Sequence, residues 1–218
     1  TAAGFTEVKE EESWELKAGG RYFVTRNQSS VIAFKIPGKD FKGFQIMASH
    51  SDSPAFKIKE NPEMEAAHCI KLNVEKYGGM ICAPWFDRPL SIAGRLVVSE
   101  GSRLVSKLVN VDRDLVMIPN LAIHMNRQVN DGYAYNAQKD MLPVFGSLEA
   151  KGTFMSLMAE AAGVKEEDIL GHDLFLYNRQ PGTIWGADET FLSCGRLDDL
   201  QCAFSSEKAV IEGENSSS

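Results

Sequence analysis

The sequence predicts an α/β protein whose chain is interrupted by a β-rich insertion. An apolar run at residues 43–50 is typical of a strand buried on both faces of a sheet, and helical periodicity begins only near residue 154. Short alternating segments recur between about residues 56 and 125, as in an antiparallel sheet or barrel. We therefore expect an α/β domain in two parts, residues 1–56 and 171–218, around an inserted domain at residues 57–170.

Two strand-like runs precede the apolar run, and Pro37-Gly38-Lys39-Asp40 ends the second of them. The expected strands of the first half of the chain are residues 21–26, 30–36, 43–50, 69–75, 90–98 and 103–109.

Helical spacing of Phe154, Leu157, Met158 and Ala161 predicts a helix that Thr153 caps. A strand at residues 173–177, a possible strand at 190–194 and a last helix after Gly195 complete the pattern.

Composition sets broad limits on the kind of protein. The 218 residues carry 23 Lys and Arg against 30 Asp and Glu, a formal net charge of −7. Hydrophobic residues make up 44% and charged residues 24%, which excludes disordered, collagen-like and coiled-coil chains. The length fits one large domain or two small ones. Net acidity disfavours nucleic acid and anionic membranes as partners.

Several common signals are missing from the sequence. It has no apolar stretch of the roughly 18 residues that a membrane span needs, and its first residues lack a signal-peptide pattern. The four cysteines form no C-x-x-C pair, so we expect reduced thiols in a cytoplasmic protein. Nucleotide-binding glycine motifs and H-E-x-x-H are also absent.

His50 and Asp52 are the first candidate site residues. Residues i and i+2 of a strand project to one face, and ligand sites in α/β sheets gather where strands end. A metal-binding histidine commonly needs a carboxylate that fixes its tautomer. The alternative, a surface histidine in a polar turn, stays open because H-x-D also arises by chance.

Asp198 and Asp199 are the second candidates, in the run Gly195-Arg196-Leu197-Asp198-Asp199-Leu200. Acidic residues at a helix start are explained by capping and by the helix dipole. Two carboxylates beside an arginine are also suited to bridging metal ions, so both interpretations remain.

The remaining motifs have simple structural interpretations. Trp85-Phe86-Asp87-Arg88 is typical of core packing with an ion pair between Asp87 and Arg88. His124 ends an apolar run, which favours a half-buried, hydrogen-bonded residue over a catalyst. His68 and His172 are expected to be structural or solvated.

Taken together, the motifs are far more specific than any one of them. Their order over essentially the whole chain resembles the M18 family of metallo-aminopeptidases, the aspartyl aminopeptidases and their bacterial relatives. The segments are His50-Ser51-Asp52-Ser53-Pro54, Tyr77-Gly78-Gly79, Trp85 to Arg95, Ile118 to His124 and Arg196-Leu197-Asp198-Asp199.

The resemblance implies a three-layer α/β/α catalytic domain, incomplete in this chain, that a β-rich dimerisation domain interrupts. It implies an exopeptidase with two metal ions, usually zinc, with cobalt or manganese as alternatives. Its substrates would be peptides with N-terminal Asp or Glu, and it would assemble from dimers into a dodecamer.

By position, the resemblance makes His50 a metal ligand, Asp52 the residue that orients it, and Asp198 the carboxylate that bridges both metals. His124 matches the histidine that the dimerisation domain offers to a neighbouring subunit. Asp199 stands where the family has Asn, which adds negative charge.

The family's other site residues, a Glu-Glu pair, a further Asp and a final His, lie downstream of the matched motifs. Two protein ligands do not hold a catalytic metal pair, so we expect the missing part of the catalytic domain to complete the site. Two alternatives remain: a fragment that is inactive alone and acts as a self-association module, and a related two-metal exopeptidase with different specificity.

Overall fold

The structure, a computed structural model, describes residues 1–38 and 41–214. Its contacts divide the chain into two units. The first unit combines Thr1–Asp52 with the chain from Arg196 onward, and the second unit is Ser53–Gly195. The chain therefore leaves the first unit, builds the second and returns. The predicted division at residues 56 and 170, with its catalytic and dimerisation parts, remains a prediction.

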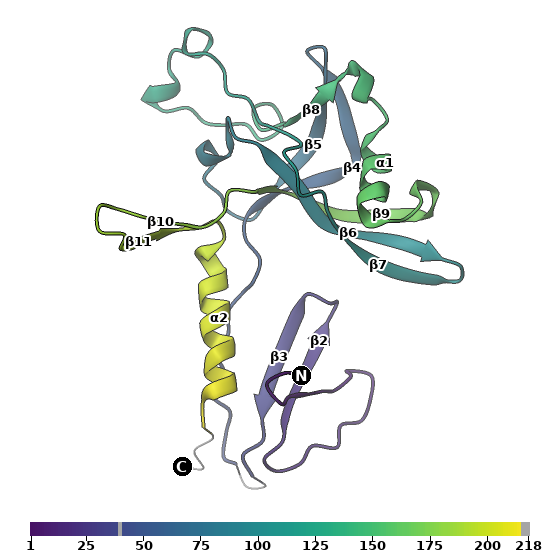
Figure 1. The fold of residues 1–218 in the computed structure, drawn as a ribbon, viewed down its shortest axis with the longest axis vertical. Coiled ribbons are helices and arrows are strands. Elements are labelled where there is room, and N and C mark those ends of the chain that lie inside the picture. Colours follow the sequence, from purple (N-terminus) through teal and green to yellow (C-terminus); the bar gives the residue numbers. More distant parts are fainter. Residues whose placement is uncertain (39–40, 215–218) are drawn as a thin grey trace. The chain divides into compact units, whose positions relative to one another are not determined.

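The first unit is a small sheet and one long helix. Its strands lie in the order β1-β2-β3, with β1 parallel to β2 and β2 antiparallel to β3 (Figure 1). The two predicted strands at 21–26 and 30–36 are confirmed as β2 and β3. The elements are β1 (Thr6–Glu7), β2 (Arg21–Arg26), β3 (Ser30–Lys35) and α2 (Leu197–Glu212).

Lys35 joins the sheet to the end of α2. Its Nζ donates hydrogen bonds to the carbonyl oxygens of Ile211 at 3.1 Å and Gly213 at 2.6 Å. The last carbonyls of a helix have no partner within the helix, so a lysine there satisfies them and complements the dipole. These bonds tie the two separate chain segments of the first unit together.

The predicted strand at residues 43–50 is absent, so that prediction is wrong for this structure. Phe44 and Ile46 are 76% and 85% exposed. An apolar run becomes a buried strand only when neighbouring strands satisfy its backbone groups. Within the described part of the first unit, no strand pairs with this run.

The second unit is built on a six-stranded antiparallel sheet in the order β7-β6-β9-β4-β5-β8 (Figure 1). The predicted strands at 69–75, 90–98, 103–109 and 173–177 are confirmed. The strands are β4 (Ala55–Ala66), β5 (Cys69–Tyr77), β6 (Leu90–Glu100), β7 (Arg103–Asn110), β8 (Val144–Ser147) and β9 (Ile169–Asn178).

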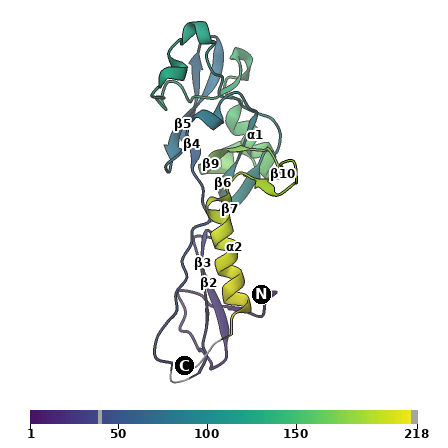
Figure 2. The same cartoon turned by 90° about the vertical axis from the view of Figure 1, so that its left-hand side faces the viewer.

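One face of this sheet forms the core of the second unit. Alternate residues of each strand point to that face, where α1 (Phe154–Ala162) packs against them (Figure 2). The fully buried side chains include Phe56, Ile58, Leu72, Leu96, Leu174, Phe154 and Met158. The period-2 pattern in the sequence thus corresponds to burial of a single sheet face.

The helix α1 confirms the predicted position but not the predicted cap. The Thr153 hydroxyl donates to the Ala150 carbonyl instead of capping the helix. The Glu63 carboxylate, from β4, accepts hydrogen bonds from the backbone nitrogens of Gly152 at 2.6 Å and Phe154 at 2.9 Å. A register shift between Ile58 and Glu63 in the pairing of β4 with β5 precedes this residue.

A separate hairpin and short helices complete the second unit. The hairpin pairs β10 (Thr183–Trp185) with β11 (Phe191–Ser193), and the Trp185 and Phe191 rings stack with centroids 4.9 Å apart. The 3₁₀ helices are η1 (Ala83–Trp85), η2 (Ile123–Met125), η3 (Val129–Asp131), η4 (Leu148–Ala150) and η5 (Glu166–Asp168).

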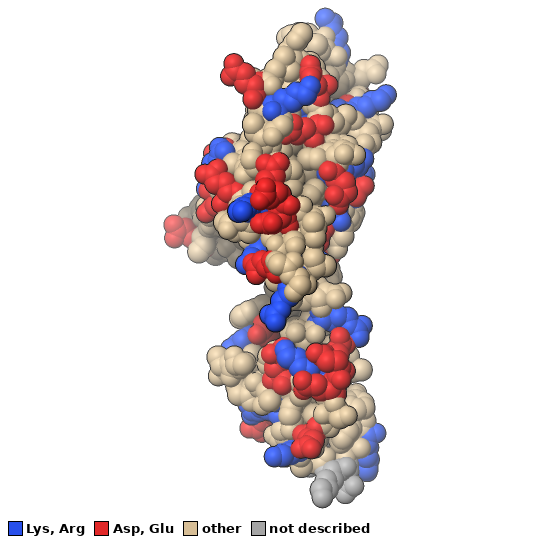
Figure 3. Space-filling view, turned by 90° about the vertical axis from the view of Figure 1, so that its right-hand side faces the viewer, with Lys and Arg blue, Asp and Glu red and all other residues tan. Residues whose placement is uncertain are grey.

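The surface carries charges of both signs. Figure 3 shows acidic and basic side chains interspersed on the visible face of each unit. Within residues 1–38 and 41–214, no helix combines the length and apolar character needed to cross a bilayer.

Candidate functional site

His50 and Asp52 contact each other directly, although no strand carries them. The His50 Nδ1 atom lies 3.1 Å from the Asp52 Oδ1 atom and 3.1 Å from the Asp52 backbone oxygen. Both acceptors are oxygens, so the proton of a neutral imidazole belongs on Nδ1 and the lone pair on Nε2. The predicted orienting role of Asp52 therefore has a direct geometric basis.

The electrostatics of His50 follow from the same contacts. Desolvation acts to lower its pKa, but the hydrogen bonds to the backbone and carboxylate of Asp52 and the charge of Asp199 outweigh it. The net effect raises the pKa of His50 above its ordinary value. The nearby carboxylates therefore stabilise a positive charge at His50.

Asp198 and Asp199 lie where the backbone enters α2. Neither residue has helical dihedral angles, and Arg196 before them has a left-handed conformation with φ of 65°. The His50 Nε2 atom lies 3.7 Å from the Asp198 Oδ1 atom and 3.6 Å from the Asp199 Oδ2 atom. The irregular helix start thus directs both carboxylates toward the histidine.

The two carboxylates have different environments. The Asp198 side chain is 93% exposed, whereas that of Asp199 is 16% exposed. Asp199 accepts hydrogen bonds from the thiol and backbone nitrogen of Cys202 and, through Oδ2, from the His50 backbone nitrogen at 3.3 Å. The Cys202 thiol and then the His50 contacts lower the pKa of Asp199, and the same thiol hydrogen bond raises the pKa of Cys202.

Asp199 therefore caps α2 and fixes the His50 segment, while Asp198 remains exposed to a ligand. The capping interpretation from sequence is confirmed for Asp199. What the sequence did not reveal is its bond to His50, because the two residues are 149 positions apart.

The donor set fits zinc in kind but not in number. Imidazole nitrogen and carboxylate oxygen are ordinary zinc ligands, and a site needs at least three from the protein. Among the described residues, no group of three or more His, Cys, Asp or Glu side chains is arranged to hold a metal ion. His50 and Asp198 are thus suited to part of a metal site.

His124 lies in η2 of the second unit and is exposed. The expectation of a half-buried residue is therefore wrong. Leu121, Ile123 and Met125 beside it are also exposed. This loop presents a histidine within an apolar surface.

The Trp85-Phe86-Asp87-Arg88 motif is a core element, but its predicted ion pair is wrong. Asp87 Oδ1 accepts a hydrogen bond from the Asn120 backbone nitrogen at 2.8 Å. Arg88 Nε is buried without a hydrogen-bond partner among the described residues. Phe86 is buried, and Trp85 packs edge-on against Phe56. Asp87 thereby holds the chain just before the His124 loop.

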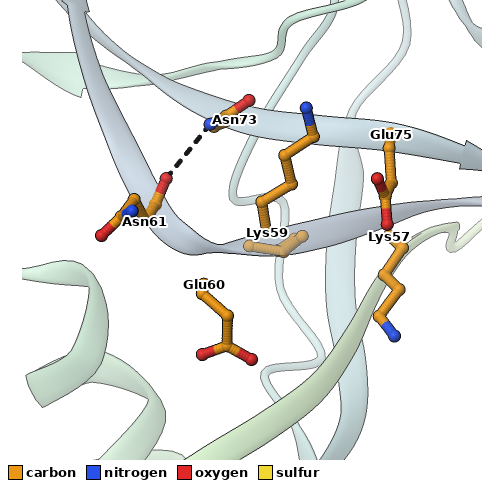
Figure 4. Close-up of a pocket in the computed structure, with 7 residues that line it drawn as sticks. Lys57, Lys59, Glu60, Asn61, Asn73 and Glu75 are labelled. Carbon is orange, nitrogen blue, oxygen red and sulfur yellow. Dashed lines mark hydrogen bonds between the residues drawn. The ribbon is translucent and has the colours of Figure 1, made fainter.

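A pocket of about 380 Å³ lies elsewhere on the second unit, between β4 and β5 (Figure 4). Charges of both signs line it, and Asn73 donates a hydrogen bond to the Asn61 carbonyl across it. None of the predicted site residues lines this pocket. Its lining residues are Lys57, Ile58, Lys59, Glu60, Asn61, Asn73 and Glu75.

Comparison with known proteins identifies the family. The model of the family described as aminopeptidase I zinc metalloprotease (M18) matches residues 1–218. The chain belongs to the M18 family. Its resemblance in motif order is thereby confirmed over the whole sequence.

Individual M18 proteins are similar in sequence and fold. "Probable M18 family aminopeptidase 2" of Clostridium acetobutylicum is 47% identical over 221 residues, covering 97% of this chain and 51% of that protein. The cryo-EM structure of the Ape4 and Nbr1 complex contains a chain with a TM-score of 0.88 and 34% identity, covering 98% of this chain and 46% of that one. The structure of the S. cerevesiae mApe1 dodecamer gives a TM-score of 0.78 at 27% identity, covering 96% and 49%.

The M18 chain spans about half the length of these relatives. This partial coverage of the M18 relatives is consistent with the incomplete set of metal-binding side chains around His50.

Proposed function

We propose that this chain supplies the first part of a zinc aminopeptidase site that removes N-terminal residues, preferentially Asp or Glu, from peptides. The observation that carries the proposal is the His50 imidazole, oriented by Asp52 and directed at Asp198. Membership of a family described as zinc metalloproteases supports the same chemistry.

Each residue has a distinct role in this proposal. His50 would hold an ion through Nε2, and Asp52 keeps the proton on Nδ1. Asp198 would offer its exposed carboxylate to both ions, while Asp199 holds the His50 segment against α2. Two zinc ions, when bound, supply Lewis-acid polarisation of the scissile carbonyl and lower the pKa of a coordinated water. Cobalt or manganese is an alternative for the same donors.

The remaining ligands and the general base come, in this proposal, from the part of the M18 catalytic domain that this chain does not span. Supporting this, the first unit exposes large apolar side chains that a further polypeptide would cover. They are Val31, Ile32, Phe44, Ile46 and Phe204. Scattered exposed apolar residues are common, but such a group on a small unit is typical of an interface.

Assembly supplies His124. We propose a homo-oligomer, a dodecamer built from dimers, in which His124 of one subunit binds the substrate carbonyl in the site of its neighbour. The exposed position of His124 and the dodecameric state of the similar yeast protein support this. Four cysteines without a disulfide are consistent with a cytoplasmic location.

Reconstitution tests the activity. This chain is expressed together with the part of the Clostridium acetobutylicum relative that it does not span, and release of N-terminal Asp, Glu and Leu is followed with added zinc. We expect activity with a preference for the acidic residues. His50→Ala and Asp198→Ala abolish it, whereas the matched control His68→Ala retains it. Full activity of His50→Ala would contradict the site.

Two other functions remain as alternatives. A chain that associates but stays inactive after reconstitution is a self-association module. Faster release of neutral residues than of Asp or Glu identifies a related two-metal exopeptidase with different specificity.

A further inference from the structure

The strand β7 forms one edge of the six-stranded sheet. It has eight residues without proline or glycine, and among the described residues only β6 pairs with it along its length. An edge strand of this length presents unpaired backbone groups to any second strand that fits. Natural proteins protect such edges unless the edge is used.

The side chains of β7 separate by face. Val105 and Val109 pack toward the core with α1. Leu104 and Leu108, on the opposite face, are 68% and 83% exposed. Two exposed leucines four residues apart on an open edge favour an interface over a solvated strand.

We propose that β7 pairs antiparallel with β7 of a second copy about a two-fold axis through Ser106. In this register Ser106 faces Ser106 of the other copy, and Leu104 faces Leu108 twice. Leucines opposite each other on one face stabilise a sheet as cross-strand pairs. The six-stranded sheet would continue across the axis into the second copy.

The charges of β7 select this register. Centring the pairing on Val105 would set Arg103 against Lys107, and centring it on Lys107 would set two Lys107 side chains against each other. Like charges directly opposite are destabilising. Centred on Ser106, Arg103 faces Val109 and Lys107 faces Val105, so cations face apolar residues only. Lys107 is also neutralised within its own chain by Glu100 at 2.6 Å.

This inference rests on the proposed self-association and names its surface, so the test separates the two. Ser106→Cys places two thiols opposite each other, within the 4.4–6.8 Å that a disulfide allows between Cα atoms. We expect oxidation to cross-link Ser106→Cys into a dimer on non-reducing gels. The control is Leu170→Cys, because Leu170 is also exposed, at 62%, but lies on β9 within the sheet.

A mixing experiment tests the register. Leu104→Cys and Leu108→Cys should cross-link when mixed and not when alone, because identical positions then lie about 13 Å apart along the strands. Leu108→Lys should weaken dimerisation at least tenfold by light scattering, while Leu170→Lys leaves it unchanged. If the wild-type protein associates but the cysteine variants form none of these cross-links, the β7 interface is overturned and self-association stands. A monomer at all concentrations overturns both, and the zinc and peptidase tests remain independent.

Discussion

The Nδ1 atom of His50 lies 3.1 Å from the Oδ1 atom of Asp52, and this contact decides which ring nitrogen faces Asp198. A carboxylate at that distance makes the imidazole both better oriented and more basic toward a metal. The pair forms within three consecutive residues, and the bond from the His50 backbone nitrogen to Asp199 fixes this segment against α2.

Replacing Asp52 with Asn should weaken zinc binding by about 10–100-fold in the reconstituted protein. The amide removes the negative charge that makes the imidazole more basic, and only the backbone oxygen of residue 52 still favours the proton on Nδ1. Competition with a chromophoric chelator measures the affinity. Asp131→Asn, at an exposed site in η3 of the second unit, is the control. Equal affinity for Asp52→Asn and wild type would count against the orienting role.

Asp198 and Asp199 should separate function from stability. Asp199→Ala removes the hydrogen bonds to Cys202 and to the His50 backbone, so the urea midpoint of the first unit should fall. Asp198→Ala should leave the midpoint near wild type but abolish zinc binding in the reconstituted protein. The reverse order of stability effects would contradict the assigned roles.

Glu63→Ala should destabilise the second unit by about 1–3 kcal/mol, because two backbone N–H groups at the start of α1 lose a charged acceptor. Urea unfolding measures the loss, and hydrogen exchange should localise it to α1. The matched control is Glu65→Ala, which removes only the exposed ion pair with Lys151 and should cost less than about 1 kcal/mol. Equal losses for both variants would exclude the capping role.

His172 should make the second unit sensitive to mild acid. Both ring nitrogens are buried without hydrogen-bond partners in the part of the chain that the structure describes, and burial is the main cause that lowers its pKa. Lys57 lowers the pKa further, while Glu60 and Asp173 oppose the shift. Below about pH 6.5 the unfolded chain takes up a proton that the folded chain resists, so stability falls with falling pH.

For one such group the loss at pH 5.5 is at most about 1.4 kcal/mol relative to pH 7.5. His172→Gln should remove this component from the pH dependence of urea unfolding, and His68→Gln, at an exposed turn, should not. An unchanged pH profile for His172→Gln would contradict the prediction.

Elements that depend on local pattern were predictable from sequence. The alternating segments of β5, β6, β7 and β9 identify strands because burial of one face leaves a period of two. The spacing of Phe154 and Met158 located α1, because burial of one helix face leaves apolar residues three or four positions apart.

Features that depend on distant partners were not predictable. The run at residues 43–50 has the composition of a buried strand but lacks strand neighbours among the described residues. Thr153 has the right type for a cap, yet Glu63 from β4 takes that role. Glu63 and the start of α1 are 91 positions apart, so no local pattern connects them.

The candidate site was predictable in identity and only partly in geometry. His50 with Asp52 and the acidic start of α2 are visible in the sequence, because each pair is contiguous. The Asp199 bond to His50 is not, since its partners are separated by 149 positions. Asp87 and Arg88 do not form the predicted ion pair, because Asp87 accepts a hydrogen bond from the Asn120 backbone and Arg88 Nε is buried apart from it.

The order in which the chain is made follows from its nested arrangement. During synthesis β9 ends at Asn178 before α2 begins at Leu197, so the six-stranded sheet emerges complete before the helix exists. At about 5–20 residues per second, His50 waits roughly 7–30 s for the carboxylates 149 positions downstream. The residues of the six-stranded sheet are thus synthesised before the His50–Asp198 pair can form.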